Sequence, residues 1–379
     1  MKVSGSHGAI SRTALIVVIV VVVVIIAGAG YAAILLTSTS TTSPLPSTTS
    51  NSTTSSVPAT TTITTSSSKV ESVTVGVIPT ADYLPLYVAV SQGYFSQQGL
   101  NVTVKFFGNG EETVPAVAQG SVQIGSEPPV SLAAALGQGF NLTMFAPADA
   151  VSYPNSTLPT TYVPGVSTNA LVVLSSSNIT SWSNLVGKTV GAVCLACIAT
   201  MQLDEALSLN GVNPSQVNVV SVAPPNWISS LEEKRVDAVA MFEPFVAQTI
   251  LLNNTQATIG EFRFIGDDAH FNQTLINSGY IATSSWVNSN PTVVKKFVAG
   301  LTMGVQEVAA NKTLAYQILS KYTGVNSQVY PYLALFNYPV APVPASWLQF
   351  SINLGVKYKL LTSNVAATSI VDTTYMPLS

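Results

Sequence analysis

The sequence predicts an α/β protein with two similar lobes, and three observations support this fold class. Apolar segments with the alternation typical of strands are followed, along most of the chain, by segments with helical spacing. Short segments also recur about 115 residues apart. Beyond residue 69 about 310 residues remain, enough to bury a large core. Two lobes built on one repeated unit enclose a cleft, which favours capture of a small ligand.

The repeat has three parts, which lie in the same order in both copies. Thr-Val-Gly at 74–76 returns at 189–191, an offset of 115 residues. The segment that follows Gly99 is echoed after Gly211, at an offset of 112. The third part pairs 120–124 with 235–239, again at an offset of 115, so that Gly120 matches Arg235.

The elements follow from periodicity and from Gly and Pro punctuation. In the first copy, strands are expected at 73–78, 102–107, 122–125 and 142–146, and helices at 83–97, 114–119 and 132–136. In the second copy, strands are expected at 189–193, 217–222 and 236–242, and helices at 199–209 and 227–234. Strands at 169–174 and 277–284 cross between the lobes, and helices at 293–308, 314–322 and 345–354 complete the chain. Alternating strands and helices predict mainly parallel sheets.

The N-terminal part does not look globular. Residues 14–36 are an uncharged, largely apolar run of 23 residues, which as a helix spans roughly 30 Å, the thickness of a bilayer core. Lys2 and Arg12 precede the run, and no charge follows until Lys69. The positive-inside rule therefore predicts a cytoplasmic segment at 1–13 and a transmembrane anchor that leaves the rest outside the cell.

A cleaved signal peptide is the alternative for residues 14–36, and it would release a secreted protein. Its apolar region is usually only ~7–15 residues, so the longer run here favours an anchor. Residues 37–69 then form a Ser/Thr-rich linker, with 24 Ser or Thr among the 32 residues of 37–68. Such a segment cannot form a core and reaches on the order of 100 Å when extended. N-glycosylation sequons suit an extracellular glycoprotein, and they begin at Asn51, Asn101, Asn141, Asn155, Asn178, Asn253, Asn272 and Asn311.

Composition excludes several function classes. The net charge is only −3 and no basic stripe is present, so a nucleic-acid partner is not expected. The globular part has one histidine, His270, and two cysteines, whereas a structural zinc site takes about four ligands. The Gly-Lys-Thr at 187–189 fails as a phosphate loop, because Trp182 stands where the first Gly is required. No Gly-x-Ser-x-Gly motif occurs either. We therefore expect no metal, no cofactor and no enzymatic activity.

The candidate site lies where strands end, because ligands of open parallel sheets sit beyond the carboxyl ends of the strands. The candidate ligand-binding residues in these loops are Thr80, Asp82, Tyr83, Ser126, Glu127, Cys194, Thr200, Trp227 and Glu243. The aromatic residues offer flat apolar walls and the acids offer polar anchors. The alternatives are core packing for the aromatics, helix capping for Asp82 and a structural role for Glu243. The loops contain no Lys or Arg, which favours a neutral or cationic ligand such as a nitrogen heterocycle.

The two cysteines form a Cys-x-x-Cys motif, Cys194 and Cys197, at the start of an expected helix. Outside the cell a local disulfide is the simplest interpretation. A redox role is the alternative, because a helix N-terminus lowers the pKa of a thiol. The repeat places Cys194 opposite Pro79, so the motif is expected at the cleft.

A set of motifs in a fixed order carries a family resemblance. The first lobe contains them at 75–77, 85–89, 92–95, 99–102 and 119–125. The second lobe has Leu-Val-Gly-Lys at 185–188, Val-Asp-Ala at 236–238 and Glu-Pro-Phe at 243–245, and the segments 286–297 and 370–377 also fit. Together they resemble the ABC-importer solute-binding proteins for nitrate, sulfonates, taurine and thiamine pyrimidine precursors.

The resemblance implies a type II periplasmic-binding-protein fold, with two crossover strands between the lobes. Lobe 1 would comprise 70–165 and 280–379, and lobe 2 would comprise 166–279. A monomer would close around a small-molecule solute and dock on an ABC permease and its ATPase, held at the extracellular face of the membrane by its N-terminal helix, an arrangement that suits an archaeon. The alternatives are an enzyme similar to thiamine-pyrimidine synthases and a sensor that acts through a partner chain. The chain departs from the family pattern at Cys194 to Cys197, where small polar residues are common.

Overall fold

The computed structural model describes most of the chain beyond residue 69. The described residues are 70–151, 162–163, 165–255, 262–268 and 273–379. The expected anchor and linker, the sequons at Asn51, Asn155 and Asn272, and His270 lie outside them. Among the described residues, no helix combines the length and the apolar character needed to cross a bilayer.

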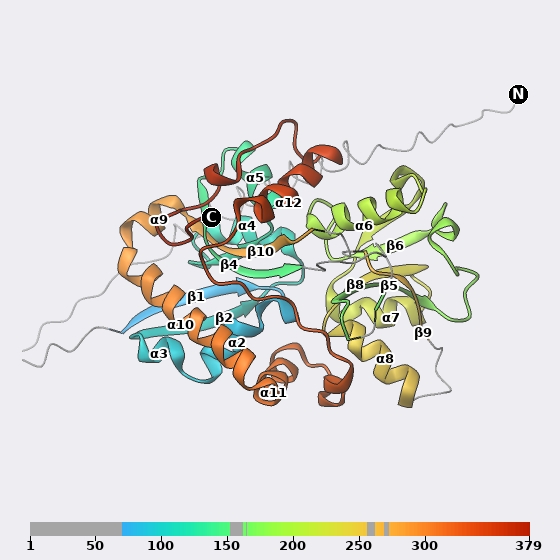
Figure 1. The fold of residues 1–379 in the computed structure, drawn as a ribbon, viewed down its shortest axis with the longest axis horizontal. Helices are drawn as coiled ribbons and strands as arrows, with labels where there is room; N and C mark the ends of the chain where they lie inside the picture. The colour runs from blue at the N-terminus through green and yellow to red at the C-terminus, as the bar shows by residue number, and fades with distance from the viewer. Residues whose placement is uncertain (1–69, 152–161, 164, 256–261, 269–272) are drawn as a thin grey trace, which may run out of the picture. The chain divides into compact units, whose positions relative to one another are not determined.

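Lobe 1 is built on two small sheets (Figure 1). Strand β1 (Glu71–Val77) pairs in parallel with β2 (Leu100–Phe106). Strand β10 (Leu275–Thr283) lies between β3 (Gly125–Glu127) and β4 (Leu142–Val151) and is antiparallel to both. We use the name lobe 1 for these strands and the helices packed on them.

Lobe 2 is built on a single five-stranded sheet in the order β7, β6, β8, β5, β9. The strands are β5 (Asn169–Leu174), β6 (Thr189–Ala192), β7 (Asn218–Ser221), β8 (Ala238–Phe242) and β9 (Phe262–Gly266). Strand β6 is parallel to β7 and β8, whereas β5 is antiparallel to β8 and β9. The exact residue limits of the two lobes remain a prediction.

The expectation of mainly parallel sheets is wrong, because lobe 1 has one parallel and one antiparallel sheet and lobe 2 has a mixed sheet. In lobe 1 only β1 and β2 form a parallel pair of strands, and in lobe 2 the parallel pairs involve β6. The strands expected to cross between the lobes, β5 and β10, run against their neighbours. A strand that enters a sheet from the other lobe is not restricted to the parallel direction that a helical crossover imposes.

The sequence repeat corresponds to a repeated strand pairing. In lobe 1 Val75 is opposite Val104, and in lobe 2 Val190 is opposite Val219, so both partners differ by 115 residues. Val75 also forms a parallel bridge with Ile124. In lobe 2, Val190, which matches Val75, pairs in the same way with Ala238. The two copies therefore place three strands in the same relation.

The third part of the repeat is shifted by one residue from the sequence expectation. Val190 is opposite Ala238, which is 114 residues after Ile124. Gly120 therefore matches Lys234 and not Arg235, and both residues have positive φ, at 73° and 56°. Each closes a short helix in the left-handed conformation, where Gly is favoured, so a non-glycine residue at 234 hid the alignment.

Helices cover the sheets in both lobes. They are α2 (Leu84–Ser91), α3 (Tyr94–Gln97), α4 (Thr113–Ala118), α5 (Pro129–Gly137), α6 (Ile198–Leu209), α7 (Trp227–Glu232), α8 (Phe245–Thr255), α9 (Ser284–Ser289), α10 (Pro291–Ala310), α11 (Lys312–Thr323) and α12 (Ala345–Lys357). The single helix expected at 83–97 is split, because Gly93 has a left-handed conformation. Helix α8 and strand β9 were not expected.

One sequon has a structural use that conflicts with glycosylation. The side-chain amide of Asn253 donates to the carbonyl of Phe262 at 2.8 Å and accepts the N–H of the same residue at 2.7 Å. A glycan on this nitrogen would break the link between α8 and β9. Four other sequon residues are exposed: Asn101, Asn141, Asn178 and Asn311. Glycosylation at these positions remains a prediction.

Helix α10 fixes the helices that follow the first strand, and Figure 1 shows it alongside α2 and α3. Phe297 on α10 stacks on Phe95, with ring centroids 5.1 Å apart. A Cβ on Gly304 would lie 2.2 Å from the carbonyl oxygen of Pro85, at the start of α2. Because α2 follows the loop that carries Asp82, this close approach positions one side of the candidate site.

We predict that Gly304→Ala lowers the free energy of unfolding by about 1–3 kcal/mol, because α10 must move away from α2. Gly137→Ala is the matched control: Gly137 ends α5, and nothing lies within 4 Å of the place that an alanine Cβ would take. There the better helix propensity of Ala gives no loss, or a gain of up to about 1 kcal/mol. Denaturant unfolding of both variants measures the difference, and equal stability of the two would contradict the tight contact.

Candidate functional site

A small cavity lies where strand ends of the two lobes meet, and its volume is about 60 Å³. Lobe 1 contributes Ile78, Asp82, Tyr83, Gly110, Thr113, Ser126, Glu127, Pro128, Asn277 and Ser278, and lobe 2 contributes Asn169, Val193, Cys194, Cys197, Ile198, Ala199, Gln202 and Phe242. A water needs at least about 10–15 Å³ of such volume, so the cavity has room for a few waters or for a small solute.

A β-bulge on β10 organises the floor of the cavity. Ile276 is opposite Ala150 and Ser278 is opposite Asp149, so Asn277 is an extra residue without a partner in register. Consecutive strand residues normally point to opposite faces. Here Asn277 Nδ2 donates to Asp149 Oδ2 at 3.1 Å and Ser278 Oγ donates to Asp149 Oδ1 at 2.6 Å. The bulge therefore brings both side chains to one carboxylate.

Asn277 also connects the lobes through a chain of hydrogen bonds. Its Nδ2 donates to Asp82 Oδ1 at 3.1 Å, in addition to Asp149. Its Oδ1 accepts a hydrogen bond from Gln202 Nε2, on α6 of lobe 2, at 3.3 Å. One amide on the crossing strand thus joins a lobe 2 helix to two lobe 1 carboxyls.

The two carboxyls beside Asn277 are buried, which disfavours their charged forms. Burial raises the pKa of Asp82 to about 6. Burial and the charge of Asp82 hold the pKa of Asp149 well above its usual range. Burial and the repulsion between two nearby carboxylates therefore both favour the protonated forms.

Glu127 is the second acidic group of the cavity. It lies on β3, only 4% exposed, and its Oε1 has no hydrogen-bond partner among the described residues. Burial, with a smaller contribution from the charge of Glu111, raises the pKa of Glu127 well above its usual range. Glu111 itself accepts the N–H of Leu195 at 2.9 Å, which ties lobe 1 to the cysteine loop.

The cysteine loop forms the lobe 2 wall of the cavity. A disulfide joins Cys194 to Cys197, and both residues are buried. Helix α6 begins immediately after Cys197. The hydroxyl of Thr200, on the first turn of this helix, donates to the carbonyl of Cys194. The disulfide and this bond together fix the loop that faces the acids of lobe 1.

Five of the nine residues proposed from the sequence line the cavity: Asp82, Tyr83, Ser126, Glu127 and Cys194. They come from three different strand ends, so the rule of carboxyl ends located the cavity correctly. Their part in binding a ligand remains a proposal.

The other four residues lie off the cavity lining. Thr80 is buried beside Asp82, and Thr200 positions the cysteine loop. Trp227 is fully buried; its indole N–H donates to the carbonyl of Val222 at 2.8 Å, and its ring meets Phe242 edge-on. Trp227 therefore supports the wall from behind, as the core-packing alternative proposes.

Glu243 joins the lobes instead of lining the cavity. Its Oε2 accepts the N–H of Ala247, at the start of α8, and its Oε1 accepts the N–H of Ala334, in the C-terminal part of the chain, at 3.0 and 3.1 Å. Its carbonyl accepts the N–H of Ala81, beside Asp82, at 3.0 Å. Burial raises the pKa of Glu243 to about 8, although the two N–H donors lower it.

Sequence reasoning missed the amides of the cavity, namely Asn169, Gln202 and Asn277. Asn169 begins β5 and Asn277 lies on β10, the two strands expected to cross between lobes. A polar residue in an otherwise apolar strand that crosses between lobes is a sequence signal for a residue that faces the cavity. Gln202 gives a weaker signal, because one amide on a helix is usually a surface residue.

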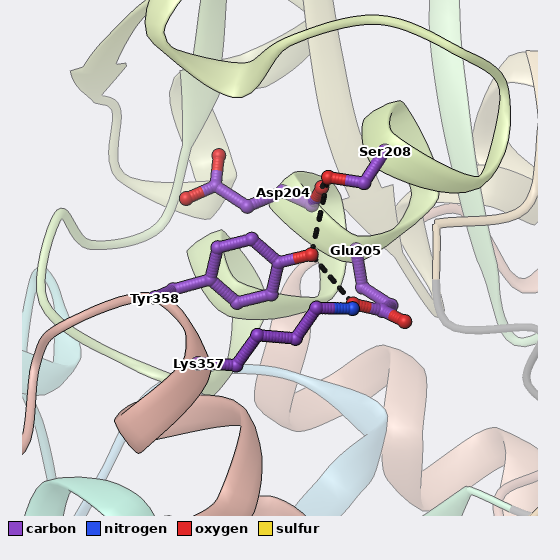
Figure 2. Close-up of polar contacts among 5 residues, drawn as sticks. All are labelled: Asp204, Glu205, Ser208, Lys357 and Tyr358. Carbon is purple, nitrogen blue, oxygen red and sulfur yellow. Dashed lines mark hydrogen bonds and ion pairs between the residues drawn. The ribbon is translucent and has the colours of Figure 1, made fainter.

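A polar cluster also joins the lobes outside the cavity, at the contact of α6 with α12 (Figure 2). Glu205 on α6 forms an ion pair with Lys357 at the end of α12 and accepts a hydrogen bond from the hydroxyl of Tyr358. The hydroxyl also contacts Ser208 Oγ at 3.2 Å. The Lys357 side chain is 53% exposed and Glu205 only 14%. We call these four residues the rim cluster.

A family model described as NMT1-like matches residues 66–320. Among curated relatives, a binding protein of Brucella abortus is 24% identical over 239 residues, which are 63% of this chain and 67% of that protein. A 4-amino-5-hydroxymethyl-2-methylpyrimidine phosphate synthase of Saccharomyces cerevisiae is 22% identical, with the same coverage of both chains. The taurine-binding periplasmic protein of Escherichia coli is 27% identical over 179 residues, 47% of this chain and 51% of that protein.

Solved structures show the same fold at low identity. The periplasmic aliphatic sulphonate binding protein of Escherichia coli has a TM-score of 0.60 and 17% identity, and the match covers 80% of this chain and 98% of that chain. The periplasmic nitrate-binding protein of Synechocystis has a TM-score of 0.64 and 14% identity, with 80% and 86% covered. The periplasmic-binding-protein fold is therefore confirmed, with parallel and antiparallel strand pairs in both lobes.

We predict that the buried Glu243 makes stability fall as the pH rises. Its pKa is about 8 when folded and near 4.5 as an unperturbed side chain, so the folded chain binds more protons between these values. The free energy of unfolding therefore falls as the pH rises through that window, by on the order of 1 kcal/mol per pH unit. Glu243→Gln removes this term, so its stability relative to the unaltered chain rises from pH 5 to pH 8.

Denaturant unfolding at several pH values measures this difference. The control is Glu233→Gln, which removes an exposed carboxylate that pairs with the exposed Arg235. Its difference from the unaltered chain stays flat over the same range. A flat difference for Glu243→Gln as well would refute the assignment.

Proposed function

The chain belongs to the NMT1-like family, and from that premise we propose that it is the solute receptor of an ABC importer. A small organic solute binds in the cavity between the lobes, and the loaded protein delivers it to a permease and its ATPase. The observation that carries this proposal is the composition of the cavity, which takes residues from strand ends of both lobes. A ligand that contacts both sides favours the state in which the lobes are together.

The names of similar proteins suggest the class of solute to test. They include proteins for sulphonate, nitrate and taurine, and a synthase of a pyrimidine phosphate. We propose a solute of this size range. The small cavity volume favours a compact molecule, and a bicyclic ligand would require the lobes to separate.

The proposal includes the membrane tether. Residues 14–36 would hold the receptor at the extracellular face, and residues 37–69 would give it reach toward the permease. Both segments lie outside the described residues, so this part rests on the sequence alone.

An enzyme similar to the pyrimidine synthase is the competing function, because such a protein is among the relatives. Within the described part of the chain, no group of three or more His, Cys, Asp and Glu residues is arranged to hold a metal ion. Asp82 lies instead at the end of a chain of hydrogen-bonded amides that joins the lobes. This arrangement supports binding more directly than turnover.

We predict saturable binding of at least one solute when the purified full chain, in mild detergent, is titrated in a calorimeter. The panel is nitrate, alkanesulfonates, taurine, thiamine, its pyrimidine and riboflavin. A stoichiometry near one and a rise in melting temperature with ligand concentration are expected, because a ligand that binds only the folded state stabilises it. The absence of saturable binding across the panel would count against the receptor.

We also predict that the rim cluster stabilises the closed arrangement by a small amount. Lys357→Met removes the ion pair with Glu205, and an exposed pair contributes about 0.2–1 kcal/mol. The ratio of closed to open molecules then falls by up to about fivefold. Distances between spin labels at Ser96→Cys and Glu232→Cys, exposed sites on α3 and α7, report this ratio.

The matched control for this measurement is Lys188→Met. Lys188 pairs with Asp237 within lobe 2, at 3.7 Å, and both side chains are exposed. Loss of that pair leaves the label distances unchanged. If Lys357→Met also leaves them unchanged, the rim cluster does not contribute to closure.

A further inference from the structure

We infer that the solute of this cavity carries a positively charged nitrogen, which is bound by Glu127 and Asp82. The inference rests on the proposed function, because it concerns the ligand of the same cavity. It departs from the nitrate and sulphonate ligands in the names of similar structures, which are anions.

Glu127 is a buried acid with an incomplete set of hydrogen bonds. The side chain is 96% removed from solvent, lines the cavity, and leaves Oε1 without a hydrogen bond among the described residues. Burying a carboxylate without a partner is strongly unfavourable. A cation in the cavity supplies the missing partner of the ionised carboxylate, whereas a sulfonate or nitrate does not.

The described lining of the cavity has no positively charged side chain. The lining residues that the structure describes include no Lys, Arg or His, and this holds for both lobes. Lys357, at the contact between the lobes, pairs with Glu205 outside the cavity. Anion-binding sites need donors that carry charge or converge from several backbone N–H groups. The acids here are arranged for the opposite ligand.

Asp82 and Glu127 also lie among other groups that become negative when they ionise. The titratable groups around Asp82 and Glu127 are acidic or phenolic: Asp149, Glu111, Tyr83, Tyr87, Tyr280 and Tyr338. Asn277 donates hydrogen bonds to both Asp82 and Asp149 and so holds the Asp82 carboxyl in position. A bound cation would lower the pKa of Asp82 and of Glu127 and release protons to the solvent.

The remaining walls set the size and polarity of the solute. Ile78, Val193, Ile198 and Phe242 are apolar, and the disulfide adds a further nonpolar surface. Asn169 and Gln202 bring amide groups from lobe 2. A short aliphatic or small heterocyclic amine with one further polar group matches this lining.

Matched pairs of probes test the inference by calorimetry on the full chain. Taurine is compared with isethionate, and ethanolamine with ethylene glycol; each pair differs in an ammonium against a hydroxyl. Nitrate and ethanesulfonate serve as plain anions. We expect binding of the ammonium member of at least one pair, weaker binding of its hydroxyl partner, and proton release that is measured from the heats in two buffers of different ionisation enthalpy.

Glu127→Gln is the decisive variant and Glu112→Gln its control. Glu112 is exposed in the same region, and its side chain does not line the cavity. Glu127→Gln should weaken binding of the ammonium probe at least about tenfold, whereas Glu112→Gln should not change it. The melting temperature of Glu127→Gln without ligand should equal or exceed that of the unaltered chain, because a buried ionisable group is removed; this separates loss of binding from loss of folding.

The outcomes separate this inference from the receptor function. Binding of nitrate, ethanesulfonate or isethionate with an affinity equal to the ammonium probes, or with proton uptake, overturns the inference and leaves the receptor in place. Ammonium binding that Glu127→Gln does not affect also overturns it. No binding by any probe would count against the receptor function as well as the charge of its ligand.

Discussion

The structure of the site depends on the β-bulge at Asn277. Without the extra residue, Asn277 and Ser278 would point to opposite faces of the sheet, and only one of them would reach Asp149. The bulge lets the amide hold Asp149 and Asp82 together and leaves its oxygen for Gln202 of lobe 2. A local irregularity of one strand thus links the acids of one lobe to a helix of the other.

Burying a carboxyl without a cation lowers the stability of the fold. The buried carboxyls near the cavity therefore set stability against ligand binding. Asp82 and Glu127 line one cavity and Asp149 shares Asn277 with Asp82, while Glu243 uses both oxygens on backbone N–H groups. The contrast is informative. Glu243 is a satisfied structural acid, whereas Glu127 keeps an oxygen without a partner among the described residues. Groups that a fold leaves unsatisfied at a cavity are those for which a ligand offers compensation.

Much of the scaffold could be predicted from the sequence, because strands, helix ends and the repeat depend on local patterns. Strand β5 and the start of α12 fall where periodicity places them. The same strand ends located Asp82, Glu127 and Cys194 at the cavity. Strand direction could not be predicted, since it depends on which lobe a segment comes from. The bulge was hidden too, because register is a property of two strands and not of one segment.

The contacts between the lobes differ in kind, and this difference determines how a ligand could control them. Around Glu243 the contacts are buried hydrogen bonds to backbone groups, near Ala81 and Ala334. Such bonds are expensive to break, because they leave polar groups without partners. The rim cluster is half exposed, and exposed ion pairs contribute little. Motion that opens the cavity is therefore easiest at the α6–α12 contact, with the Glu243 side as the pivot. The proposed ligand, held by Glu127 on one lobe and by groups near Cys194 on the other, would act between these two sides, where a modest interaction energy is enough to shift the equilibrium.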